Sequence, residues 1–371
     1  MHTTDRLAFL DALRGLAALY VVLFHVMAMP SPAVSAGPVL TPILAAGGTG
    51  VALFFVISAF SLCYTMPRHT ATGKPIRSFY LHRFFRIAPL FYCWLAFSLY
   101  RDGRGAHVGH AAAEVAANVS FTFNLVQGWQ QGIVWASWAI GVEMLFYALF
   151  PLLLGAIRGL PGALLLAAAL TGVAMLASFG LLGEQAKVWT GDYGLLRHAP
   201  VFAFGLCAFF AYERLTALEG ERAWRWGIAL GVAGLLGLAA TVALLSWAIA
   251  PAIGWIACGL MYALLLLGMS QCAPRFVVNP ISTSLGKISY SLYLGHPAVI
   301  AILGPLFGHV RQATSVPALA YATCALATLA VALPLAWLTY RLIEVPCIAL
   351  GKRLGPQRRP VDPASLRAAE R

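Results

Sequence analysis

Residues 8–29 read AFLDALRGLAALYVVLFHVMAM, an apolar run that only Asp11, Arg14 and His25 interrupt. As an α-helix, a segment of this length crosses the hydrocarbon core of a bilayer, which is roughly 30 Å thick. The run therefore predicts a transmembrane helix. A cleaved signal peptide is the alternative, because small residues ending at Ala36 follow the run. The three ionisable side chains within the run argue against that alternative.

Nine further apolar runs follow, so the sequence predicts an all-α, polytopic transmembrane helix bundle of about ten spans. The composition agrees, because 60% of the residues are hydrophobic and 10% are charged, whereas soluble domains carry about 25% charged residues. So few charges cannot cover a protein surface in water, and we expect most of the surface to face lipid. The predicted spans are 8–29, 44–66, 79–100, 134–157, 161–182, 196–213, 226–247, 249–270, 283–304 and 317–341.

Lysine and arginine residues are unevenly distributed between the two sides of these spans. With the N-terminus in the cytoplasm, 20 of the 25 fall on the cytoplasmic side, which predicts that both termini are cytoplasmic. We assign residues 1–345 to a membrane domain and 346–371 to a basic, flexible cytoplasmic tail. A net charge of +12 would suggest nucleic acid in a soluble protein. No basic stretch here carries interleaved stacking aromatics, so we expect no nucleic-acid partner.

The seven cysteines do not form a metal-binding or disulfide pattern. Their number is odd, none are spaced as C-x-x-C, and no cluster of histidine and cysteine has the spacing of zinc ligands. We therefore expect neither a disulfide framework nor a metal site.

Ionisable side chains at membrane depth are costly, so each one within a span is a candidate for function. His25 lies in the outer half of the first span, where an imidazole can take a proton from a hydroxyl near neutral pH. A structural hydrogen bond between helices is the alternative. Arg14, about three turns earlier on the same face, could bind an anion from the cytoplasm. Its alternative is an intrahelical ion pair with Asp11.

Three later spans carry further candidates. Arg83 and Arg86 would present two guanidinium groups on one helix face, which suits phosphate oxygens, and membrane-surface anchoring is the alternative. Glu143, the only acid of its span, could orient a histidine, act in acid–base chemistry or hold a hydroxyl. A salt bridge to another helix is its alternative. His296 follows the hydroxyl-rich stretch 289–293, which could line a glycan cavity or bond neighbouring helices.

Five segments, in chain order, resemble motifs of the acyltransferase-3 superfamily of membrane proteins, which includes bacterial O-acetyltransferases of cell-surface polysaccharides. Any one match alone is weak, whereas five in register are specific. The segments are LDALRG at 10–15 with His25, GVALFFVIS at 50–58, RFFRIAP at 83–89, Val142-Glu143 with Phe146-Tyr147, and LGKISYSLYL at 285–294 with His296.

The sequence departs from the family pattern at several positions. Met144 stands where a second Glu is common, which leaves Glu143 alone and argues against a scheme with two carboxylates. Ala59 replaces a usual Gly, and Gly141 replaces the usual Ser.

The resemblance implies acyl-CoA as donor and co-substrate, with acetyl as the commonest acyl group and no permanently bound cofactor. It implies a hydroxyl of an extracytoplasmic or membrane-linked glycan as acceptor, and a bacterial inner membrane as location. A transporter or flippase is the alternative, because polar residues that line a bundle also suit substrate passage. The oligomeric state stays open. The expected roles are catalysis by His25 and Glu143, donor binding by Arg14, Arg83 and Arg86, and substrate binding by Ser137, Tyr290, Ser291 and His296.

Overall fold

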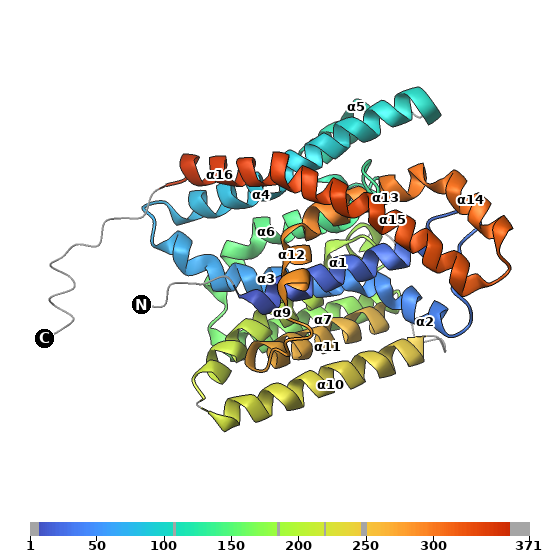
Figure 1. Ribbon diagram of the computed structural model, residues 1–371. Coiled ribbons are helices and arrows are strands. Elements are labelled where there is room, and N and C mark those ends of the chain that lie inside the picture. Colours follow the sequence, from blue (N-terminus) through green and yellow to red (C-terminus); the bar gives the residue numbers. More distant parts are fainter. Residues whose placement is uncertain (1–6, 107–108, 184–185, 219, 246–250, 357–371) are drawn as a thin grey trace, which may run out of the picture.

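The structure, a computed structural model, is built from helices (Figure 1). It describes residues 7–106, 109–183, 186–218, 220–245 and 251–356, and it contains no β-strand within these ranges. Within the same ranges, eight helices are long and apolar enough to cross a bilayer, and a bent pair of helices makes a ninth candidate. This confirms the prediction of a polytopic transmembrane helix bundle.

The long helices coincide with the predicted spans, with boundaries shifted by a few residues. Short helices α2 (Leu40–Ala45), α5 (Ala112–Val119) and α8 (Lys187–Thr190) lie in the connections. The long helices are α1 (Ala8–Ala28), α3 (Gly50–Thr70), α4 (Pro75–Arg101), α6 (Trp138–Ala156), α7 (Gly159–Ser178), α9 (Leu195–Thr216), α10 (Glu221–Leu245), α11 (Pro251–Gln271) and α15 (Pro317–Thr339).

Two of the predicted spans differ from simple apolar helices. α4 covers the third span but is not among the eight, because its basic residues lower its mean hydropathy. The ninth span comprises α12 (Pro280–Lys287) and α13 (Ser289–Ile302), and the chain bends by 61° before α14 (Gly304–Ala313). A capping box between Asn279 and Ser282 starts α12.

Helix α1 packs against α3, α12 and α13. Its close approach to α12 depends on two glycines. A Cβ atom at Gly15 would collide with the carbonyl oxygen of Ser282, and one at Gly286 would collide with the carbonyl oxygen of Asp11. Small residues let helix backbones approach closely in lipid. This contact fixes α1 against the segment that leads into α13.

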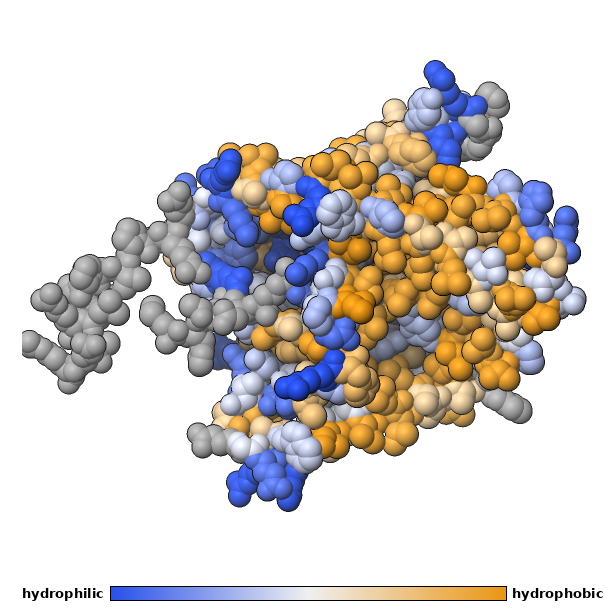
Figure 2. Space-filling model, viewed as in Figure 1, coloured by the Kyte–Doolittle hydropathy of each residue, from blue (hydrophilic) through white to orange (hydrophobic). Residues whose placement is uncertain are grey.

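The described chain begins and ends at the same end of the bundle, on the left in Figure 1. We call it the proximal end and the opposite end the distal end, so that α1 runs from proximal to distal. Figure 2 shows an apolar surface between two more hydrophilic ends, as expected for a protein whose sides face lipid. The hairpin of α10 and α11 lies at the edge of the bundle (Figure 1), and exposed Trp224, Leu235 and Leu236 project from α10.

The first residues of the predicted tail, 346–354, lie in a helix. Helix α15 continues through a π-helical turn (Tyr340–Glu344) into α16 (Val345–Leu354), so this part of the predicted tail is helical. α16 packs on α4, where Gly351 lies against the Phe85 side chain. Residues 357–371 of the predicted tail lie outside the described residues.

Candidate active site

A cavity of about 670 Å³ lies at the proximal end, between α1, α3, α4, α6, α12, α13 and α16. Among the residues that line it, six are basic and two are acidic, so the cavity carries a net positive charge. A cleft lined mainly by one sign of charge concentrates ligands of the opposite sign. Figure 2 shows the hydrophilic surface of this end. The charged lining residues are Arg14, Arg68, Arg83, Arg86, Lys287, Lys352, Asp11 and Glu143.

Glu143 faces this cavity from α6 and is held by two hydroxyl groups. Ser58 Oγ donates to Glu143 Oε1 at 2.6 Å, and the Tyr147 hydroxyl donates to the same oxygen. Among the described residues no salt bridge to Glu143 is present, so the alternative of an ion pair with another helix is not what the structure shows. Neither does Glu143 contact His25 by a hydrogen bond. The carboxylate therefore organises the cavity wall rather than the histidine.

The two arginines of the predicted pair have different surroundings. Arg86 forms a salt bridge with Glu344, a carboxylate that is 1% exposed, and Ser291 Oγ donates to the other oxygen of that carboxylate at 2.5 Å. Arg83 has no ion pair within the described part of the chain, and its buried Nε has no hydrogen-bond partner there. Its guanidinium lies 5.8 Å from the centroid of the Tyr147 ring. Arg83 is thus the member of the pair whose charge is left for a ligand.

Arg14 forms an ion pair within its own helix and also lies where it could bind an anion. Its Nη2 donates to Ser61 Oγ on α3 at 2.7 Å, and its Nη1 lies 3.6 Å from Asp11 Oδ1 in the same helix. The side chain also lines the cavity. The intrahelical pair therefore orients Arg14 without removing it from the cavity wall.

His25 and His296 form a hydrogen-bonded pair, with 2.8 Å between His25 Nδ1 and His296 Nε2. The other ring nitrogen of His296, Nδ1, lies 3.1 Å from the carbonyl oxygen of Leu292, which only accepts, so this nitrogen carries the proton. In a neutral His296, Nε2 must then accept from the Nδ1–H of His25. This network assigns a free lone pair to Nε2 of His25.

The histidine pair lies on the distal side of the cavity. Along α13, Tyr293 lines the cavity and His296 follows three residues later, with 5.9 Å between the two ring centroids. Along α1, Arg14 lines the cavity and His25 lies further toward the distal end. His296 is fully buried, whereas His25 is partly exposed. Neither ring is among the residues that line the cavity, and of the two only His25 has exposed surface.

Of the four predicted substrate-binding residues, Ser137, Ser291 and His296 do not line the cavity. Ser137 is fully buried before α6, and its Oγ lies 3.4 Å from the Gln131 carbonyl oxygen. Ser291 is engaged by Glu344 and is also buried. Tyr290 does line the cavity, and its hydroxyl donates to the Ile87 carbonyl oxygen. Of the hydroxyl-rich stretch, Ser289, Tyr290 and Tyr293 line the cavity, whereas Ser291 bonds the buried Glu344 carboxylate.

Sequence reasoning missed Glu344, Ser58, Tyr147 and Tyr293 as parts of this site. Ser58, Tyr147 and Tyr293 stand inside three of the motifs quoted above, and each is a polar residue within a predicted span, which is the signal that could have found them. Glu344 follows the last predicted span, 317–341, so its sequence position carries no such signal. Only the fold shows that it is buried beneath Arg86.

Comparison with protein families places residues 7–339 in one family, described as "Acyltransferase domain". Comparison with curated proteins and with solved structures gave no match. The matched segment contains both histidines, the arginines of the cavity and Glu143, but not Glu344. Because the match covers most of the chain, the family is established, and the protein is a membrane acyltransferase of the acyltransferase-3 family.

Proposed function

We propose that the protein transfers an acyl group from acyl-CoA to a hydroxyl of a glycan. The observation that carries this proposal is the position of a histidine with a free Nε2 beside a positively charged cavity at one end of the bundle. Family membership supplies the reaction class. The charge of the cavity suits the pyrophosphate and ribose phosphate of CoA.

In this proposal, CoA binds in the proximal cavity. Arg83, which lacks a carboxylate partner within the described residues, takes a phosphate group together with Arg14. Arg86 reaches the phosphates less freely, because Glu344 already neutralises it. The pantetheine arm then extends past Glu143 and Tyr147 toward Tyr293, which places the thioester next to the histidine pair.

The chemical step uses His25 as general base. As the acceptor oxygen attacks the thioester carbonyl carbon, its proton moves to Nε2 of His25. The tetrahedral intermediate then expels the CoA sulfur, which takes the proton from the imidazolium, so that an ester and CoA are formed and His25 is regenerated. His296 positions His25 through the Nδ1–H hydrogen bond and keeps it in the required tautomer.

The location follows from the same assignment. The proximal end faces the cytoplasm, where acyl-CoA is available, and this orientation agrees with the excess of basic residues assigned to that side. We propose acetyl-CoA as donor, a polysaccharide hydroxyl as acceptor, and the bacterial inner membrane as the site of action.

The test uses the purified full-length protein in detergent and follows CoA release from acetyl-CoA in the presence of a panel of glycans. We expect His25→Ala to lower acyl transfer by about 10²–10⁴-fold, the usual contribution of general acid–base catalysis, while acetyl-CoA binding is retained. His309→Ala, an exposed histidine on α14, is the control and should leave transfer unchanged. A folded His25→Ala protein with transfer near wild type would show that this role is wrong.

A further inference from the structure

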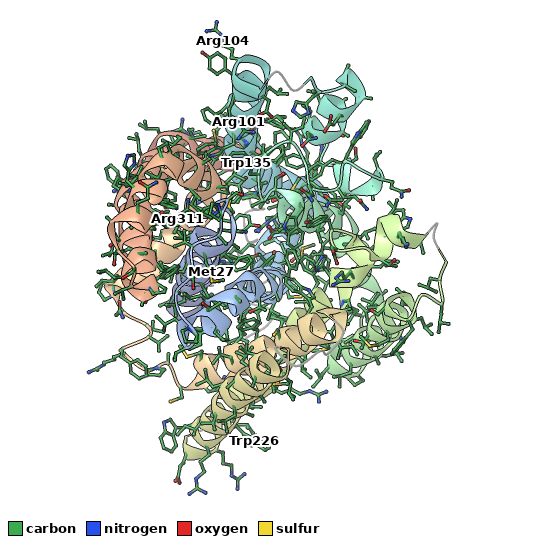
Figure 3. The ribbon with its side chains drawn as sticks, turned by 90° about the vertical axis from the view of Figure 1, so that its right-hand side faces the viewer. Met27, Arg101, Arg104, Trp135, Trp226 and Arg311 are labelled. Carbon is green, nitrogen blue, oxygen red and sulfur yellow. The ribbon has the colours of Figure 1, made fainter. Side chains whose placement is uncertain are left out.

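A second pocket, of about 480 Å³, lies at the distal end of the bundle. Its walls come from the residues that follow α1, from the junction of α13 and α14, and from the loop before α6. Figure 3 looks onto this end and shows Met27, Trp135 and Arg311 around the end of α1. The lining residues are Met29, Pro30, Ser31, Trp135, Ile300, Ala301, Gly304 and Arg311.

The pocket begins one helical turn beyond the histidine pair on both helices that carry it. The backbone N–H of Met29 donates to the His25 carbonyl oxygen at 2.9 Å, and Ile300 follows His296 by four residues. One turn of helix rises about 5.4 Å. On the opposite side, Tyr293 belongs to the proximal cavity. The two histidines therefore separate two pockets that face opposite ends of the molecule.

Trp135 gives the distal pocket an aromatic wall. The guanidinium carbon of Arg101 lies 3.9 Å from the centroid of the Trp135 ring, and Asp102 holds Arg101 through an ion pair at 2.7 Å. Arg101 covers part of the Trp135 ring, but Trp135 is still 38% exposed. An indole held in this way offers an apolar surface on which the C–H face of a sugar ring can pack.

Arg311 gives the pocket its charge. Its Nη1 donates to the carbonyl oxygen of Pro32, and in the part of the chain that the structure describes no carboxylate pairs with it. No acidic residue is among those that line the pocket. A guanidinium binds a carboxylate through charge-assisted hydrogen bonds, so the pocket favours an anionic ligand.

We infer that the distal pocket is the acceptor subsite and that it takes an acidic sugar, with the ring packed on Trp135 and the carboxylate at Arg311. This inference rests on the proposed function, because it gives His25 an acceptor hydroxyl from the distal side. It adds the face from which the acceptor arrives and the chemical class of sugar. The donor and the acceptor then meet at the histidine pair from opposite ends of the bundle.

The experiment compares binding of two probes, methyl glucuronide and methyl glucoside, by saturation-transfer NMR with purified full-length protein. Wild type should bind both probes and prefer the glucuronide. Arg311→Gln should weaken glucuronide binding roughly tenfold, the size of a charge-assisted hydrogen bond, and change glucoside binding by less than about twofold. Trp135→Ala should abolish binding of both probes, and Trp135→Phe, which keeps a ring, should retain part of it.

Trp226→Ala is the matched control, because Trp226 is an exposed tryptophan on α10, near the bottom of the view in Figure 3 and away from Trp135. It should leave both probes bound as in wild type. Absence of probe binding to wild type, or unchanged binding in Trp135→Ala and Arg311→Gln, would overturn the inference. Acetyl-CoA binding, measured on the same samples, reports the fold and the donor site separately. Wild type that binds glucuronide through these residues but never consumes acyl-CoA would refute the proposed function and leave the sugar site standing.

Discussion

The proximal cavity and the distal pocket differ in charge, size and side-chain chemistry. The proximal cavity, about 670 Å³, is lined by six basic residues and several tyrosines, whereas the distal pocket, about 480 Å³, has one arginine and a tryptophan. A long polyanion such as CoA matches the first, and a single sugar ring matches the second. In the function proposed above, this difference lets the donor and the acceptor occupy separate pockets on either side of the histidine pair.

The largest expected effect concerns the wall of the proximal cavity. Glu344→Ala leaves the Arg86 guanidinium in the positively charged cavity without its counter-ion, and removal of one partner from a buried pair costs about 3–5 kcal/mol. Since Arg86 is partly exposed, we expect the free energy of unfolding to fall by about 3 kcal/mol, seen as a lower Tm in detergent. The double variant Arg86→Met/Glu344→Leu should recover most of this loss. Equal Tm values for Glu344→Ala and wild type would show that the ion pair does not hold the wall.

The next effect concerns the histidine pair, which lies between the proximal cavity and the distal pocket. His296→Ala removes the acceptor of the His25 Nδ1–H, so we expect kcat to fall roughly 10²-fold while KM for acetyl-CoA stays within about twofold. His296→Gln should restore part of kcat, because its amide oxygen can accept the same N–H. Steady-state kinetics of the three proteins tests this. A loss in His296→Ala that appears mainly in KM would instead mean that His296 binds substrate.

A smaller effect distinguishes the two arginines of α4. Arg83→Gln should raise KM for acetyl-CoA about tenfold, because its guanidinium has no carboxylate partner among the described residues. Arg86→Gln is the matched control, with the same substitution one turn away, and should raise KM less and lower stability more, since Glu344 binds Arg86. The Arg83 effect should shrink at high salt. If both variants raise KM equally, the distinction between a free and a paired arginine is wrong.

The smallest effect is at the distal end, where His110 bridges two carboxylates. Its ring nitrogens lie 3.1 Å from Asp102 Oδ2 and 3.1 Å from Glu114 Oε2. Partial burial lowers the pKa of His110, but the hydrogen bonds to Asp102 and Glu114 outweigh it, so the pKa is raised above its ordinary value. The charged bridge therefore makes its full contribution to stability when the pH is below the unfolded-state pKa of His110, about 6.5. That contribution is lost as pH rises through the folded-state pKa.

His110→Gln should remove this pH dependence. We expect the change in unfolding free energy between acid and alkaline pH to be below about 1 kcal/mol, because pairs near the surface are screened. Thermal unfolding across the pH range measures it. A wild-type protein that became more stable as pH rises through this window, relative to His110→Gln, would contradict the sign.

The spans and the positions of His25, Arg14 and Arg83 could be predicted from sequence, because apolar runs and the rarity of ionisable residues at membrane depth are local signals. The partners of these residues could not. His25 bonds His296 across 271 positions of sequence, and Arg86 pairs with Glu344 across 258. Such contacts depend on the rotation of each helix about its axis. Rotation also turns Ser291 toward Glu344 and away from the cavity, which a hydroxyl inside a motif does not reveal.

The distal pocket illustrates a second limit. Arg311 and Trp135 lie far apart in sequence, and each is unremarkable there, since a basic residue and a tryptophan near a membrane surface are common. They come together because the chain bends by 61° before α14 and carries Arg311 over the end of α1. The predicted span 283–304 ends at this bend, and the sequence does not show the direction in which the chain continues.

The central claim is that this chain adds an acyl group to a glycan through His25. The most direct measurement is mass spectrometry of surface glycans from cells that lack the chain, complemented with wild type, His25→Ala or His309→Ala. We predict a mass increment of one acyl group with wild type and with His309→Ala, and none with His25→Ala at equal membrane abundance. An increment that persists with His25→Ala, or no increment with wild type, would contradict the account.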